Sequence, residues 1–212
     1  MKHNQILNLS YYAIFIGIIF LLGLTPLGLL VLPILPVAVT TLHIPVIIGG
    51  YTLGVKGGAV LGFSFGLLSL IRCFTTPDIV ATIVLGTGTG FGLYNLFLIV
   101  VILFLPRILT GVFAALTYKG LARLDKSNVV AMGVSAFVGS MTNTILFLGM
   151  LALFAFQPVA AAYDTESIGG LAKILLGVVG LNGVTEAVVA VILCTAIGKA
   201  LRAYQTSHKR PA

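Results

Sequence analysis

Residues 11–24 read YYAIFIGIIFLLGL, and residues 25–50 continue the apolar run as TPLGLLVLPILPVAVTTLHIPVIIGG. A helix that is apolar on every face is either buried or crosses a membrane. The second stretch is also apolar, but its prolines prevent a regular helix. Irregular backbone at membrane depth must be covered by protein or line a cavity. The sequence therefore predicts a membrane helix over about 9–25, followed by an apolar, proline-rich outer lid over about 26–41.

The composition of the whole chain supports a membrane protein. Of 212 residues, 59% are hydrophobic and only 8% are charged, whereas a soluble domain carries about a quarter charged residues. Long continuous apolar runs favour helices over barrel strands, which alternate. At about 20 residues per crossing, the length accommodates six helices and no second folded domain. The predicted fold is an all-α, single-domain membrane protein over residues 1–212, with spans at about 9–25, 43–55, 57–73, 106–124, 128–156 and 170–203.

The net charge of +7 has an uneven distribution along the chain. Nine of the twelve basic residues lie at four places along the chain: Lys2; Lys56; Lys119, Arg123 and Lys126; and Lys199, Arg202, Lys209 and Arg210. An even number of predicted crossings separates each place from the next, so all four lie on the same side of the membrane. The positive-inside rule makes the shared face cytoplasmic, so both termini are predicted to be cytoplasmic. The basic charge thus indicates topology and contact with the lipid bilayer, and it does not indicate nucleic-acid binding.

Polar residues inside two predicted spans need an explanation. Glu186 lies deep in the last span, with Asn182 one turn earlier on the same helical face. Burying such a carboxylate at the bilayer centre costs about 3 kcal/mol, so it faces either a cavity or a polar partner on a neighbouring helix. Asn143 and Thr142 lie in the fifth span. Their amide and hydroxyl groups suit either a ligand or an interhelical hydrogen bond.

Two arginines are predicted at the outer ends of helices, Arg72 after the third span and Arg107 at the start of the fourth. A guanidinium there could bind a carboxylate through two parallel hydrogen bonds. Alternatively, it could extend to the interface or pair with Asp78. His43 could carry a proton, donate to a ligand or anchor the second span. A metal site is not indicated, because the other two histidines lie near the termini.

Small residues predict close helix packing in two places. Ala13 and Gly17 form a small-xxx-small notch on the first span, and Gly58, Gly62 and Gly66 form a longer stripe on the third. We expect a tight cytoplasmic turn at residues 56–58 between the second and third spans. The partner of the first notch could be another helix of this chain or another protein.

Nucleotide and cofactor motifs are missing from the sequence. Residues 86–92 read GTGTGFG, which does not fit GxGxxG, and no GxxxxGK[ST] pattern occurs. We interpret residues 74–92 as an outer loop and expect Pro106 to divide an outer apolar piece from the fourth span. The two cysteines form no CxxC pair. No nucleophile–base set is recognisable, so neither an enzyme nor a bound cofactor is predicted.

An ordered series of short motifs now links these features: TPLG at 25–28, TLHIPVIIGG at 41–50, FGLLSLIR at 65–72, LPRILTGVFA at 105–114, MTNTILFLG at 141–149 and GLNGVTEAVVA at 180–190. The series resembles the substrate-binding S components of energy-coupling-factor (ECF) vitamin transporters, and most closely the pantothenate-type branch. The resemblance covers nearly the whole chain. It departs from the family pattern within residues 79–105.

The resemblance implies a six-helix protein of the bacterial plasma membrane that binds a vitamin at its outer side. Its implied partners are a transmembrane T component and two cytoplasmic ATPase subunits. The family's AxxxA docking motif is matched by Ala13 to Gly17. Pantothenate, a small anion with an amide and two hydroxyls, would suit an arginine together with Asn143, Asn182 and Glu186.

Other functions stay open at the level of sequence. The vitamin could be folate, riboflavin or a thiamine precursor. A stand-alone carrier that couples transport to protons through Glu186 is another class, although the internal inverted repeat typical of such carriers is not evident. A purely structural membrane subunit is disfavoured by the polar residues in the spans and by the apolar lid.

Overall fold

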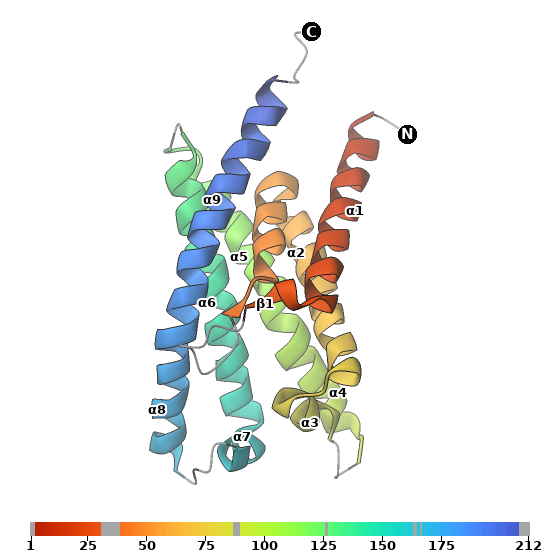
Figure 1. Cartoon of the computed structure of the whole chain (residues 1–212), viewed down its shortest axis with the longest axis vertical. Helices are drawn as coiled ribbons and strands as arrows, with labels where there is room; N and C mark the ends of the chain where they lie inside the picture. Colours follow the sequence, from red (N-terminus) through yellow and green to blue (C-terminus); the bar gives the residue numbers. More distant parts are fainter. Residues whose placement is uncertain are drawn as a thin grey trace.

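The computed structural model describes residues 3–30, 39–86, 90–125, 127–162, 165 and 167–207. Long helices run along the long axis of the molecule, and short elements join them (Figure 1). The elements are α1 (His3–Leu24), η1 (Pro26–Gly28), β1 (Leu29–Leu30), β2 (Val39–Thr40), α2 (His43–Thr75), α3 (Ile79–Leu85), α4 (Leu93–Leu98), η2 (Ile99–Phe104), α5 (Leu105–Leu121), α6 (Val129–Phe154), α7 (Phe156–Ala162), α8 (Ile168–Val178), η3 (Val179–Gly183) and α9 (Val184–Ser207). The middle of the predicted lid, residues 31–38, lies outside the described residues.

Within the described ranges, five helical stretches are long and apolar enough to cross a membrane. They are Gln5–Leu24, His43–Thr75, Leu93–Leu121, Val129–Phe154 and Ile168–Ala203. Large apolar side chains on their outer faces, such as Leu21, Phe137 and Ile192, are exposed. Their exposure is expected when lipid rather than water surrounds the bundle. The predicted helical architecture with membrane-length helices is therefore confirmed.

The long helix α2 reverses direction at Gly54, where φ is 72° and ψ is −166°. Glycine adopts this positive φ without the steric cost of a Cβ atom. Gly49 and Leu61 would lie about 18 Å apart in a straight helix, yet the Leu61 side chain fills the space beside Gly49. Residues 43–53 and 55–75 are therefore two arms that run back along each other. The reversal lies slightly earlier than the turn expected at residues 56–58.

The second arm of α2 packs tightly against the helix that contains α5. A Cβ atom on Gly58 would collide with the backbone of Gly111, and one on Gly62 or Gly66 would collide with residues 103–108. The glycine stripe thus lets the two backbones approach closely, as its spacing predicted. This contact places the beginning of α5 against the middle of the α2 arm.

Pro106 does not divide the fourth span, so that expectation is wrong. The chain is helical without a break from α4 through the π-helical η2 into α5. A proline has no N–H for the carbonyl four residues earlier, which is that of Ile102. The Arg107 side chain donates from Nη1 to this carbonyl at 3.0 Å. The wider π turn and this substitute donor accommodate the proline within the helix.

The two ends of the bundle differ in their connections. α1 begins and α9 ends at the upper end of Figure 1, where α5 is joined to α6, whereas α3 and α7 lie at the lower end. Lys119 belongs to α5, and Lys199 and Arg202 belong to the last part of α9. These basic residues therefore lie toward the end at which α1 begins.

Residues 74–92, which we interpreted as an outer loop, contain the short helix α3, and the short helix α7 follows α6. In α3, the Asp78 carboxylate accepts a hydrogen bond from the Ala81 N–H at 2.8 Å, and Gly86 ends the helix with a φ of 63°. Such a cap and a left-handed glycine stabilise a short helix. The strands β1 and β2 pair in antiparallel fashion, with Leu29 opposite Thr40. β1 lies at mid-height of the bundle rather than at its end (Figure 1).

Candidate functional site

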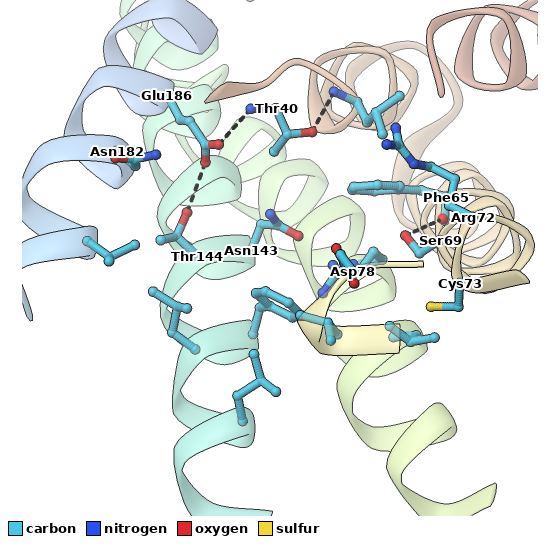
Figure 2. A pocket seen from close by; sticks show the side chains of 18 of the residues that line it. Thr40, Phe65, Ser69, Arg72, Cys73, Asp78, Asn143, Thr144, Asn182 and Glu186 are labelled. Carbon is cyan, nitrogen blue, oxygen red and sulfur yellow. Dashed lines mark hydrogen bonds between the residues drawn. The ribbon is translucent and has the colours of Figure 1, made fainter. Parts of the chain in front are cut away.

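A cavity of about 330 Å³ lies between the two apolar clusters of the core. Leu42 and Phe65 contribute to it from the first cluster, and Leu103 and Leu151 from the second. Its volume is at the lower end of the range for small-molecule sites. Polar side chains from β2, α2, α5, α6, η3 and α9 point into it (Figure 2).

Arg107 is buried in the wall of this cavity, with 8% of its surface exposed. Its guanidinium carbon lies 4.3 Å from the centre of the Phe147 ring and 5.4 Å from that of Phe65. Because Nη1 donates to the Ile102 carbonyl, the side chain is held in one orientation. Nε has no hydrogen-bond partner among the described residues. The site thus presents a fixed cation with unused donor capacity.

Glu186 lies on the α9 side of the cavity and is also buried. One carboxylate oxygen accepts a hydrogen bond from the Thr40 backbone N–H at 2.8 Å, and the other accepts one from the Thr144 hydroxyl at 3.3 Å. Both bonds are drawn in Figure 2. The first bond ties strand β2, which is the end of the lid region, to α9. The sequence left open whether Glu186 faces a cavity or a polar partner on a neighbouring helix. In the structure it does both, because it bonds to Thr144 of α6 and lines the cavity.

Two buried amide side chains complete the polar wall. Asn143 from α6 and Asn182 from η3 both line the cavity. The side-chain oxygen of Asn143 has no hydrogen-bond partner within the described part of the chain. Thr142 is next to Asn143 in sequence but is not among the residues that line the cavity. Thr144, on the other side of Asn143 in the sequence, lines the cavity instead.

Arg72 lines the opposite side of the cavity, on the second arm of α2 together with Ser69 (Figure 2). Its Nη1 donates to the Gly23 carbonyl near the end of α1 at 3.2 Å. Asp78 also lines the cavity. The cations of Arg72 and Arg107 therefore come from α2 and α5, whereas Glu186 comes from α9.

Comparison with known proteins identifies the family. The model of the "ECF transporter, substrate-specific component" family matches residues 8–198. The chain belongs to this family. It is 36% identical over 214 residues to the pantothenic acid transporter PanT of Lactococcus lactis subsp. cremoris, covering 95% of this chain and 96% of that protein. It is 26% identical over 209 residues to the pantothenate transporter PanT of Leuconostoc mesenteroides subsp. mesenteroides, covering 95% of each.

Family membership confirms the resemblance inferred from the motifs. The protein is an S component, and so a transporter subunit rather than an enzyme. Its apolar helices fit a multi-pass protein of a bacterial membrane. S components of ECF transporters work with energy-coupling partners, so a vitamin substrate and such partners follow in general terms from the family.

His43 of this S component does not line the cavity, although its neighbours Thr40 and Leu42 do. Its side chain is 1% exposed, and neither ring nitrogen has a hydrogen-bond partner among the described residues. It begins α2 at the level where the lid region joins the bundle. His43 is thus enclosed behind the cavity wall.

Several lining residues of the S component were not identified from the sequence. They are Phe65, Ser69, Thr76, Phe147 and Thr40. Helical spacing could have indicated two of these groups, because Phe65, Ser69, Arg72 and Thr76 recur at intervals of three or four, as do Asn143 and Phe147. Thr40 could not be found in this way, since it reaches the site from an irregular segment.

Metal chemistry is not supported by the side chains that the structure describes. No group of three or more His, Cys, Asp or Glu residues there could hold a metal ion. Cys73 and Cys194 are buried as free thiols in different clusters. The cavity instead offers a cation, hydrogen-bonding groups and apolar surface, a combination that recognises a small amphipathic anion.

Proposed function

We propose that this S component binds pantothenate at the outer side of the membrane. It would deliver the vitamin through a T component and two ATPase subunits. The observation that carries the proposal is the Arg107 guanidinium, fixed by its bond to the Ile102 carbonyl, in the wall of a cavity that also holds polar side chains. The names of the two related transporters support the same substrate.

Each part of pantothenate would meet suitable chemistry in the cavity. Its carboxylate would bind Arg107, assisted by Arg72, through charge-assisted hydrogen bonds. Its amide and hydroxyls would bind Asn143, Asn182 and Glu186, which offer both donors and acceptors. The geminal dimethyl group would pack on the apolar part of the wall. His43 and Thr142 would act indirectly in this arrangement, by supporting the wall of the site.

The proposed topology has six crossings, with both termini in the cytoplasm. The two arms of α2 count as separate crossings, because the chain reverses at Gly54. The first arm is only about 16 Å long at 1.5 Å per residue, so the lid region continues the chain toward the outer side. The lid over residues 26–41 would close the cavity from outside. The chain would form a single domain.

The first helix is the proposed docking surface for the T component. Ala13 and Gly17 are both exposed, and no other segment among the described residues comes within 4 Å of where a Gly17 Cβ would be. Exposed large neighbours such as Ile14 and Ile18 surround the notch. A face of small residues lets another membrane helix approach closely.

Titration calorimetry on the purified protein in detergent tests the proposed substrate. Pantothenate should bind at one site per chain without ATP, whereas riboflavin, folate and biotin should not compete. Tight binding of a different vitamin would replace pantothenate in the proposal. Failure of all these vitamins to bind would contradict the capture function itself.

A further inference from the structure

Charged side chains line the cavity on opposite sides. Arg72 and Arg107 reach it from α2 and α5, whereas the Glu186 carboxylate reaches it from α9. Figure 2 shows Arg72 and Glu186 on opposite sides of the space, with Asn143 between them. A bound molecule that extends across the cavity therefore meets Arg72 at one side and the Glu186 carboxylate at the other.

The Glu186 carboxylate is held in place by the fold. The Thr40 N–H binds one of its oxygens, and the Thr144 hydroxyl binds the other. Only 7% of the residue is exposed, so water and salt would screen its charge weakly. The bond to Thr40 also prevents the carboxylate from turning away without breaking the link between β2 and α9. A ligand group near Glu186 must therefore tolerate a fixed hydrogen-bond acceptor.

We propose that Glu186 is a specificity-determining residue that restricts the site to vitamins with an uncharged, hydroxyl-bearing end and excludes forms phosphorylated at that end. The inference rests on the proposed function, because pantothenate carries its carboxylate and its primary hydroxyl at opposite ends. With the carboxylate drawn toward Arg72, which lies across the cavity from Glu186 (Figure 2), the primary hydroxyl would lie on the Glu186 side. A hydroxyl donates to a carboxylate, whereas a phosphate has only negative charge to present there.

The repulsion is large enough to decide which form is bound. Two like charges about 5 Å apart near a protein surface repel strongly enough to weaken binding by at least about 100-fold. A phosphate monoester carries close to two negative charges at neutral pH. The same carboxylate that helps to bind the unmodified vitamin thus rejects its phosphorylated form.

The variant Glu186→Gln separates the charge from the structural role. The glutamine oxygen can still accept from the Thr40 N–H. The glutamine amide can donate to the Thr144 hydroxyl, which has the Ser140 carbonyl as another acceptor at 3.3 Å. The connection between β2 and α9 is therefore retained while the negative charge is lost.

The test measures binding of pantothenate and of pantothenate phosphorylated on its primary hydroxyl, by calorimetry, to the wild type and Glu186→Gln. The wild type should prefer pantothenate by at least about 100-fold, and Glu186→Gln should reduce this preference by at least about tenfold. Asp78→Asn is the matched control, because it removes the carboxylate of another residue that lines the same cavity. It should change both affinities by a similar factor.

The outcomes separate this inference from the proposed function. If pantothenate binds but the preference is the same in the wild type and Glu186→Gln, the inference is wrong and the proposed function stands. Equal binding of both forms to the wild type would also overturn it. If pantothenate does not bind to the wild type, the proposed function fails, and the inference fails with it.

Discussion

Replacing Arg107 with glutamine should remove most of the affinity for a carboxylate ligand. The guanidinium is buried between α2 and α6, and its Nη1 already donates to the Ile102 carbonyl. Nε has no partner among the described residues, so a ligand carboxylate is expected to bind at the remaining donors. In Arg107→Gln the carboxylate would enter a cavity that has lost its buried cation.

The size of the loss follows from this burial. Removing one partner of a buried ion pair costs about 3–5 kcal/mol, which corresponds to about 150- to 5000-fold in Kd. Arg107→Lys keeps the charge, but its single nitrogen cannot serve both the carbonyl and the ligand in the same geometry. Losing one charge-assisted hydrogen bond costs about 1.5–3 kcal/mol, so lysine should have an intermediate effect.

Calorimetry with pantothenate and its uncharged alcohol analogue, pantothenol, separates charge recognition from general damage. Arg107→Gln should weaken pantothenate binding strongly but change pantothenol binding only a few-fold. Lys173→Gln is a matched control, because it removes an exposed basic charge from α8 that does not line the cavity. Equal losses for both ligands in Arg107→Gln, or a full loss in Lys173→Gln, would refute the assignment of Arg107 as the carboxylate anchor.

Three further predictions concern docking, packing and the lid. Replacing Ala13 and Gly17 with leucine should abolish uptake of labelled pantothenate by cells while calorimetry still detects binding; if uptake persists, α1 is not the docking helix. Gly62→Leu should lower Tm in detergent, because its side chain would collide with the α5 backbone; a core overpacking cost of at least about 1–3 kcal/mol is expected, and an unchanged Tm would contradict the close contact. Thr40→Pro removes the N–H that binds Glu186 and should speed pantothenate release by about tenfold or more. Thr40→Val keeps this N–H and should not change the release rate. Equal release rates for the wild type and Thr40→Pro would indicate that this bond does not hold the lid.

Much of the site could be anticipated from residues that are costly at membrane depth. Arg107, Asn143 and Glu186 were identified because a charge or an amide in an apolar span must have a partner or a cavity. The glycine stripe on α2 was likewise predictive, because its spacing places every glycine on one helical face. The locations of Thr142 and His43 were not predictable in this way, since the face of a helix that meets a cavity depends on the other helices.

Local sequence rules also failed to predict that the fourth span is one continuous helix. Pro106 predicts a break, and only the π turn before it, with the Arg107 side chain bound to the Ile102 carbonyl, explains why the helix persists. The contact between Thr40 and Glu186 joins residues that are 146 positions apart. Local propensity contains no information about such a contact.

The sequence by itself determined the membrane setting, the helical class, the family and the polar residues that need a partner. These properties follow from the free-energy cost of placing charged groups and unpaired backbone groups in lipid. This cost depends on the residues of each segment alone, so it can be judged from the sequence. Only the tertiary structure decided which polar residues share one cavity, where α2 reverses and which atoms hold Glu186. Those features arise from packing between distant segments, because a cavity and its charge pattern exist only once several helices enclose them.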